Sequence, residues 1–177
     1  MSKPTFATVW LDGCSGCHMS FLDIDERLID LVGLVDIVYS PLVDLKVYPA
    51  HVDIALIEGA VSSEEDLEKI KHIRAHTTTL ITLGDCAVNS NVPSMRNPWG
   101  ADAVLRRAYV ENAAFNQQIP NQVIPRLLPK VLPVHHVVDV DVFIPGCPPS
   151  ADTIFYVLTE LLAGRTPDVS SKTRFGA

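Results

Sequence analysis

The 177-residue sequence has no apolar run approaching the roughly 18 residues that a membrane-spanning helix needs. Its first ten residues, MSKPTFATVW, contain neither the basic and apolar regions of a signal peptide nor a twin-arginine signal. The net charge is −7, so the excess of positive charge typical of nucleic-acid-binding proteins is also missing. We therefore expect a cytoplasmic protein with no membrane span and no nucleic-acid partner.

The chain also lacks internal repeats and low-complexity segments, and its length is about that of one domain. We therefore treat residues 1–177 as a single domain. Hydrophobic residues make up 47% of the sequence, which is enough for a core and for additional interface surface.

Cysteine is scarce. The four cysteines are Cys14 and Cys17 in WLDGCSGCHMS, Cys86 in LGDCAVNS and Cys147 in IPGCPPS. In the cytoplasm, cysteines more often bind metals or carry out redox chemistry than form structural disulfides. The main question that the sequence raises is therefore what these four thiols hold.

Apolar, β-branched runs alternate along the chain with segments of helical periodicity. Strands are predicted at residues 5–11, 35–40, 52–59, 78–84 and 137–146. Helices are predicted at residues 20–33, 62–76, 101–111 and 150–164, and Ser62 and Glu65 have capping-box spacing at the start of the second one. The alternation predicts an α/β fold: a flavodoxin-like, doubly wound, mostly parallel five-stranded sheet with strand order 2-1-3-4-5.

A long proline-rich excursion, residues 89–133, precedes the last predicted strand. Connections of this length in a compact domain are usually functional or cover a surface that faces a partner. We expect the excursion to face a partner protein, with SMRNPWG (94–100) as a docking element.

The predicted sheet brings the four cysteines together. Cys14 and Cys17 follow the first strand, Cys86 follows the fourth and Cys147 follows the fifth. The carboxyl ends of parallel strands lie at one rim, and this is where open α/β folds bind their ligands.

The spacing alone leaves three possibilities for the thiols. Structural zinc usually takes two close cysteine pairs, and this chain has one. A reactive dithiol or inert thiols would leave Cys86 and Cys147 without a common role. A [4Fe–4S] cluster suits ligands that arrive from separate loops, glycines precede all the cysteine loops, and Pro148 follows Cys147 as in ferredoxin motifs. The pattern favours the cluster, with zinc and a dithiol as alternatives.

Four segments in this order, LDGCSGCHMSFLD, DIALIEGAV, TLGDCAVN and VFIPGCPPSADTI, make the sequence resemble the small subunit of [NiFe] hydrogenases. The resemblance runs from about residue 5 to 164 and is strongest to the short, electron-transfer small subunit of cytoplasmic, bidirectional NAD-reducing [NiFe] hydrogenases. It implies a flavodoxin-like domain whose ligands to one proximal [4Fe–4S] cluster are Cys14, Cys17, Cys86 and Cys147.

The resemblance also implies partners. A separate large subunit would hold the Ni–Fe centre, and diaphorase iron–sulfur and flavin subunits would reduce NAD⁺ at FMN. The chain would relay electrons between them as a subunit of an oxidoreductase and would not be catalytic alone. None of the 30 residues after Cys147 is cysteine or histidine, so we expect a single cluster.

Two other functions compete with this one. The homologous cluster subunit of complex I, a quinone reductase, has two adjacent cysteines where this chain has Cys14 and Cys17 spaced as C-x-x-C, which makes it the second choice. A stand-alone flavodoxin-like module with a cluster or a flavin is the third, although DGCSGCHMS lacks the hydroxyl-rich phosphate loop of flavodoxins.

Glu58 ends the third predicted strand at the same rim. A carboxyl group buried beside the thiols could exchange protons during hydrogen oxidation, and the resemblance implies that the EGA glutamate lies near the proximal cluster. Two roles are therefore open for Glu58: a proton relay, and backbone hydrogen bonding that orders the loop before Ser62.

Three histidines are weaker candidates. His18 could tune a cluster by hydrogen bonding or be an ordinary core or surface histidine. His135 and His136 lie at the start of a predicted strand, where neighbours face opposite sides, so we do not expect them to share a metal ion.

Overall fold

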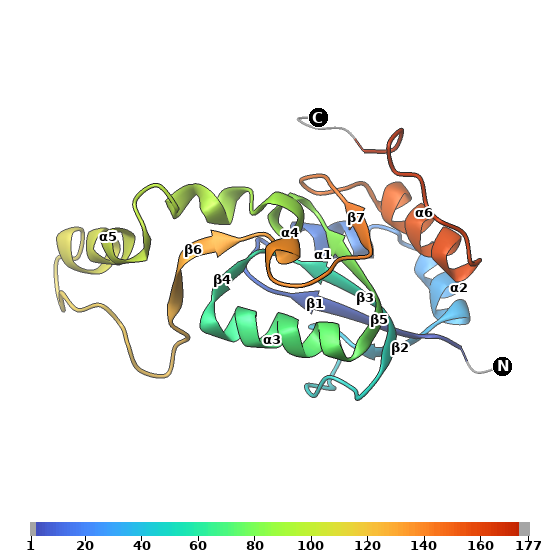
Figure 1. The fold of residues 1–177 in the computed structure, drawn as a ribbon, viewed down its shortest axis with the longest axis horizontal. Helices are drawn as coiled ribbons and strands as arrows, with labels where there is room; N and C mark the ends of the chain where they lie inside the picture. The colour runs from blue at the N-terminus through green and yellow to red at the C-terminus, as the bar shows by residue number, and fades with distance from the viewer. Residues whose placement is uncertain (1–2, 174–177) are drawn as a thin grey trace.

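The computed structural model describes residues 3–173, and its centre is a five-stranded sheet (Figure 1). The strands lie in the order β2-β1-β3-β5-β7, and every neighbouring pair is parallel. This confirms the predicted order, because these are the five predicted strands in chain order. Their bounds are β1 (Thr5–Trp10), β2 (Asp36–Tyr39), β3 (Val52–Glu58), β5 (Thr77–Leu83) and β7 (Val142–Ile144).

Helices cover both faces of the sheet, so each central strand is buried on both sides. One core cluster joins the sheet to α1 (Gly16–Leu22), α2 (Arg27–Leu34) and α6 (Ala151–Leu162). The other joins it to α3 (Glu64–Ala75), α4 (Asp85–Asn89) and the short 3₁₀ helix η3 (Val134–His136). Alternate residues of β1 enter opposite clusters, with Phe6 in the first and Ala7 in the second.

The single helix predicted at residues 20–33 is wrong. The structure has two helices there, α1 and α2, separated by a turn in which Asp25 has a positive φ of 57°. Ile24 within that turn is buried, so the apolar pattern continues through the break and conceals it.

Two other predicted boundaries shift. The capping box of α3 is Ser63 with Asp66, one residue later than predicted, because strand β4 (Val61–Ser63) continues through Ser62. The fifth strand is shorter than predicted, since residues 134–136 form η3 and regular pairing starts only at Val142. The closing helix α6 ends just before Gly164, which has φ of 72°.

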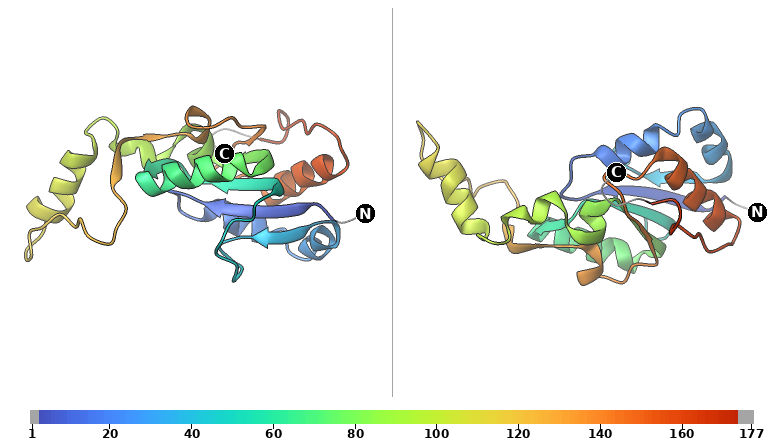
Figure 2. Two further views of the ribbon diagram at one scale, coloured as in Figure 1. Left: turned by 60° about the horizontal axis from the view of Figure 1, so that its bottom comes forward. Right: turned by 90° about the horizontal axis from the view of Figure 1, so that it is seen from above.

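A projecting segment leaves the body of the domain between β5 and β7. Strand β6 (Leu127–Leu132) pairs antiparallel with β4 to form a second, two-stranded sheet that the sequence did not predict. The 3₁₀ helix η1 (Val92–Arg96), α5 (Ala101–Arg106) and the π-helix η2 (Arg107–Glu111) precede it. We call residues 96–130 the arm, and Figure 2 shows its outer part standing away from the sheet in both views. Between residues 3 and 173, no helix is long and apolar enough to cross a membrane.

Candidate metal centre

The loop after β1 carries Cys14 and Cys17. Leu11 N–H donates to the carbonyl of Glu58 at 2.9 Å, and Asp12 and Ala60 exchange two backbone hydrogen bonds of 3.1 and 2.7 Å. A Cβ added at Gly13 would lie only 3.2 Å from Gly59 Cα, so the glycine allows the loop to approach the turn after β3. These contacts fix the position from which α1 begins.

Helix α1 begins between the two cysteines. Its N-cap residue, Ser15, is left-handed with φ of 66°, and its side chain caps no backbone N–H. Cys14 is exposed before the helix, whereas Cys17 is buried in its first turn. The free N–H groups of that turn therefore need an acceptor from elsewhere.

Glu58 is that acceptor. Its carboxylate, 1% exposed, accepts the backbone N–H of Cys17 at 3.3 Å and that of His18 at 3.0 Å. The Nδ1 atom of His18 also contacts Glu58 Oε2. In the tautomer that carries its proton on Nδ1, the ring donates a hydrogen bond to this carboxylate. The strand β3 residue thus caps a helix that lacks its own cap and holds Cys17 in place. The side chain of Glu58 therefore orders the start of α1 and not the loop before Ser62.

The loops of Cys86 and Cys147 are joined to each other. Gly84 N–H donates to Ile144 O at 2.8 Å, Asp85 N–H donates to Gly146 O at 2.8 Å, and Gly146 N–H donates to Asp85 Oδ1 at 2.7 Å. The predicted topology places both loops at the rim, but no sequence pattern indicates that Asp85 ties them together.

Gly84 also brings this pair of loops against Cys17. It has φ of 82°, and a Cβ built on it would overlap the Sγ atom of Cys17. Gly146, with φ of 141°, would place a Cβ 2.6 Å from Pro149 Cα. Gly84 is therefore required for the cysteine loops to meet, and Gly146 is required for the turn of its own loop.

The four thiols are close enough to influence one another. Burial raises the pKa of Cys86 from 9.0 to about 11, with further contributions from Cys147, Cys14 and Glu58. Burial also raises the pKa of Cys17, followed by the negative charges of Glu58 and the other three cysteines. The structure thus brings all four predicted residues, and Glu58, to one rim.

Within the described residues 3–173, the four cysteines neither form disulfides nor gather into a site for a single metal ion. All four cysteines are free of disulfides. Among residues 3–173, no three histidine, cysteine, aspartate or glutamate side chains lie close enough together to hold a single metal ion. The four thiols reach the rim from three loops, those after β1, β5 and β7.

One polar group near the thiols, Asn91, was not identified from the sequence, and a second, His18, was predicted only as a weak candidate. Asn91 Nδ2 lies 3.5 Å from Cys147 Sγ, where it can donate a hydrogen bond. His18 is buried, and its Nε2 atom has no hydrogen-bond partner among the described residues. An NSN sequence three residues beyond a cysteine was the available signal for Asn91, but it is too common to identify a contact.

The other histidines do not join the site. His135 and His136 lie in η3, not on a strand, so the predicted reason for dismissing them is wrong. Both are exposed, and their rings are 4.6 Å apart, edge to face.

Comparison with known proteins agrees with this geometry. The family described as NADH ubiquinone oxidoreductase, 20 kDa subunit, matches residues 14–161. The chain is 45% identical over 174 residues to the delta subunit of the NAD-reducing hydrogenase HoxS of Cupriavidus necator, covering 96% of this chain and 83% of that one. It is 36% identical over 174 residues to one subunit of the F420-non-reducing hydrogenase of Methanothermobacter marburgensis, covering 96% of this chain but only 56% of that longer protein.

Solved structures extend the comparison. A chain of an NAD⁺-reducing [NiFe]-hydrogenase in the H₂-reduced state matches with a TM-score of 0.93 and 40% identity, covering 98% of this chain and 99% of that one. A [NiFeSe]-hydrogenase chain from Dm. baculatum shares the fold alone, with a TM-score of 0.60 and 15% identity, covering 97% of this chain and 69% of that one. The chain therefore belongs to the family of the NADH ubiquinone oxidoreductase 20 kDa subunit, and within it resembles the small subunits of NAD-reducing [NiFe] hydrogenases.

Proposed function

We propose that Cys14, Cys17, Cys86 and Cys147 hold one [4Fe–4S] cluster and that the chain is the electron-transfer subunit of an NAD-reducing [NiFe] hydrogenase. The observation that carries the proposal is the meeting of four free thiols from separate loops at one rim, in a chain 45% identical to a subunit of such an enzyme. When bound, the cluster supplies a one-electron carrier between the Ni–Fe site of a large subunit and the FMN-containing diaphorase that reduces NAD⁺.

The residues present fit this group. Thiolates are the ligands that iron–sulfur clusters take, and four are available. Gly84 keeps a Cβ atom away from the Cys17 thiol where the loops meet. Only one close pair, Cys14 and Cys17, is present, whereas structural zinc usually takes two close pairs, and this favours the cluster over zinc.

The chain's own residues would hold and shield this group. Glu58 fixes the backbone of the first turn of α1, and through it the Cys17 thiol. Asp85 keeps the Cys86 and Cys147 loops in register. Asn91 is placed to donate to Cys147 Sγ, and such bonds raise the reduction potential of iron–sulfur centres.

Exposure of Cys14 and Cys147 indicates where the partners belong. A one-electron carrier works best when shielded from water and close to the next carrier, so both exposed thiols should be covered in the assembled enzyme. We propose that a hydrogenase large subunit and the diaphorase subunits cover them in the cytoplasm. The excursion at residues 89–133, which contacts Cys147 through Asn91, would face one of these partners.

The proton-relay role of Glu58 stays a prediction. Its carboxylate contacts three donor groups, two of them backbone N–H, and this is what a structural role requires. If Glu58 also relays protons, replacing it with glutamine should slow H₂/D⁺ exchange, measured per intact cluster.

The experiment that tests the function is anaerobic purification from the native host, followed by iron, sulfide, zinc and flavin analysis. About four irons and four sulfides per chain are expected for a cluster of this type, with H₂-dependent NAD⁺ reduction in the assembled complex. Stoichiometric zinc without brown absorbance would refute the cluster. A bound flavin in its place would favour the flavodoxin-like module.

A further inference from the structure

The four cysteines of the rim differ in their access to solvent. Cys14 and Cys147 are exposed, Cys86 is partly buried and Cys17 is buried. Gly84, two residues before Cys86, packs against Cys17 Sγ. We call Cys14 and Cys147 the outer pair, and Cys17 and Cys86 the inner pair.

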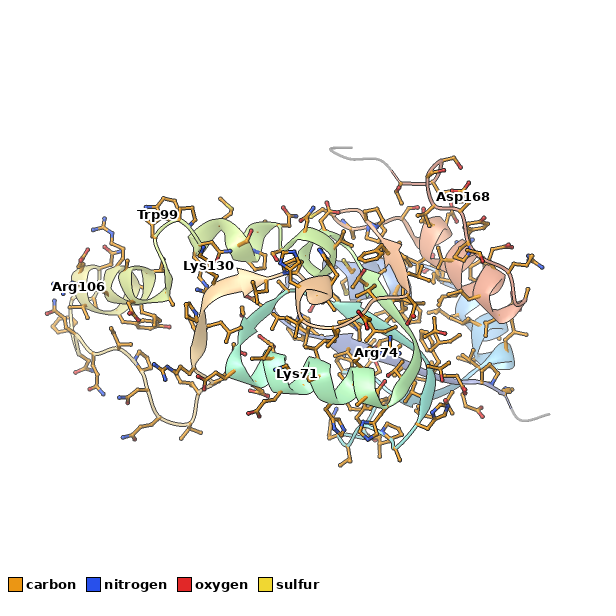
Figure 3. All side chains as sticks on the ribbon, in the orientation of Figure 1. Lys71, Arg74, Trp99, Arg106, Lys130 and Asp168 are labelled. Atoms are coloured by element: carbon orange, nitrogen blue, oxygen red, sulfur yellow. The ribbon has the colours of Figure 1, made fainter. Side chains whose placement is uncertain are left out.

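The outer pair lies in irregular backbone. Cys14 is in the loop between β1 and α1, and Cys147 is in the loop between β7 and α6. A Cβ added at Gly16 would lie 3.2 Å from Cys14 Sγ, so the glycine leaves space beside that thiol. Both thiols are exposed with the arm in place, and Figure 3 shows Trp99 and Arg106 of the arm away from the sheet.

The inner pair is held in helices. Cys17 lies in the first turn of α1, and its N–H donates to Glu58 at 3.3 Å. Cys86 lies in α4, and its carbonyl accepts the N–H of Ser90 at 3.0 Å. Moving either thiol outward to meet a reactant therefore requires a helix to open, which breaks these hydrogen bonds.

We propose that the outer pair is the entrance through which the chain takes up its cluster. Cys14 and Cys147 are the first ligands to bind an incoming [4Fe–4S] cluster that carries exchangeable thiolates, and Cys17 and Cys86 replace the remaining thiolates afterwards. This inference rests on the proposed function, because it gives the order in which the ligands assigned there act. Only the first exchange is bimolecular, since the later thiols act at the high effective concentration of groups on the same chain.

Each exchange is a substitution without electron transfer. A bond from iron to the leaving thiolate breaks, a bond from iron to a cysteine Sγ forms, and the cysteine proton passes to the leaving thiolate, which departs as a thiol. The oxidation states of iron and sulfide do not change, so the reaction needs no oxidant or reductant.

The first test is alkylation of the apo full chain with iodoacetamide, carried out anaerobically and followed by mass spectrometry of its peptides. Cys14 and Cys147 should be alkylated about tenfold or more faster than Cys17, because a buried thiol reacts only through local opening. Cys86 should react at a rate between these. The measurement uses the wild type, so it does not depend on the folding of a variant, and equal rates at all four cysteines would overturn the proposal.

The second test measures cluster capture from a synthetic [4Fe–4S] cluster ligated by four 2-hydroxyethanethiolates. Visible circular dichroism reports capture, because the synthetic cluster is achiral until the chain binds it. Cys14→Ala/Cys147→Ala should lower the second-order rate constant of capture about tenfold or more, since the remaining thiols need local opening. Cys17→Ala/Cys86→Ala should keep that constant within about twofold, because the first exchange is unaltered, but its product should retain synthetic thiolates in native mass spectrometry.

The matched control adds Lys71→Cys to the outer-pair variant. Lys71 is exposed on α3 (Figure 3), so the change supplies an accessible thiol away from the rim and should not restore capture. Restoration by this control, wild-type capture by the outer-pair variant, or an equal loss in the inner-pair variant would each overturn the proposal while the wild type still loads. A wild type that takes up no cluster would instead refute the proposed function, and the entrance with it.

Discussion

Replacing Glu58 with glutamine perturbs the hydrogen bonds that hold Cys17 in place. Glutamine has one acceptor oxygen, whereas the Glu58 carboxylate uses both oxygens to accept from Cys17 N–H, His18 N–H and His18 Nδ1. If the amide oxygen keeps the two His18 bonds, the amide nitrogen faces the Cys17 N–H and leaves that donor buried and unpaired. Glutamine therefore does not preserve the hydrogen bonds that Glu58 accepts.

The cost follows from this geometry. A buried donor left without a partner costs about 1–3 kcal/mol, and the loss of charge from the two remaining bonds costs about 1 kcal/mol more. Local opening of the first turn of α1 should thus become easier by about 2–4 kcal/mol. At about 1.4 kcal/mol per factor of ten, the amides of Cys17 and His18 should exchange with solvent about 30- to 700-fold faster.

Hydrogen exchange followed by mass spectrometry on anaerobic, cluster-loaded protein measures the exchange rate of these two amides. Release of iron to a chelator should also be faster in the variant. Asp66→Asn is a matched control, because Asp66 is likewise a buried carboxylate that accepts N–H groups at a helix start, but for α3 on the other face of the sheet. It should leave the exchange of Cys17 and His18 unaltered. Equal protection of these two amides in the wild type and Glu58→Gln would refute the capping role of Glu58.

Three further predictions concern the cysteine loops. Gly84→Ala, whose Cβ would overlap Cys17 Sγ, should abolish iron binding, whereas Gly33→Ala, with open space around its Cβ, should leave the iron content unchanged. Serine at Cys86 or Cys147 replaces a soft thiolate with a harder oxygen, and should remove or alter the cluster's electron paramagnetic resonance signal and H₂-dependent NAD⁺ reduction; an unaltered signal would contradict the ligand assignment. Finally, burial raises the pKa of Cys86 from 9.0 to about 11 and also raises that of Cys17, so the folded apo-chain holds these protons more tightly than the unfolded chain does. The contribution of these two thiols to stability should therefore be fully present below about pH 9 and be lost as the pH rises through about 11 and beyond, measured as the urea midpoint, and alanine at both positions should flatten that fall.

The strand order could be predicted because each strand is marked locally. Val52–Glu58 is a mostly apolar run followed at once by a glycine turn, as a strand buried on both faces should be. The alternation of strands and helices indicates a parallel sheet, and the carboxyl ends of its strands share one rim, where Cys86 and Cys147 meet the first pair of cysteines.

The remaining features depend on contacts that no local pattern records. Strand β4 has three residues, Val61–Ser63, too few to show a period of two, and its partner β6 lies more than 60 residues later. The position of Glu58 at the rim was predictable, but its donors were not, because they depend on Ser15 adopting a left-handed conformation that leaves α1 uncapped.

The placement of the arm between β5 and β7 has a consequence for how the chain can vary. These strands are adjacent, with Leu83 opposite Ile144, so the chain returns to the sheet wherever the excursion ends. Trp99 and Gly100 border the same groove as Arg126 and Leu127. The two ends of the outer arm, residues 100–126, therefore also lie close together. Because doubling a loop changes its closure entropy by only about 0.6 kcal/mol, insertions or deletions in the outer arm barely alter the stability of the sheet. Selection can therefore lengthen, shorten or re-surface this segment to suit a different partner while the cysteine rim remains as it is.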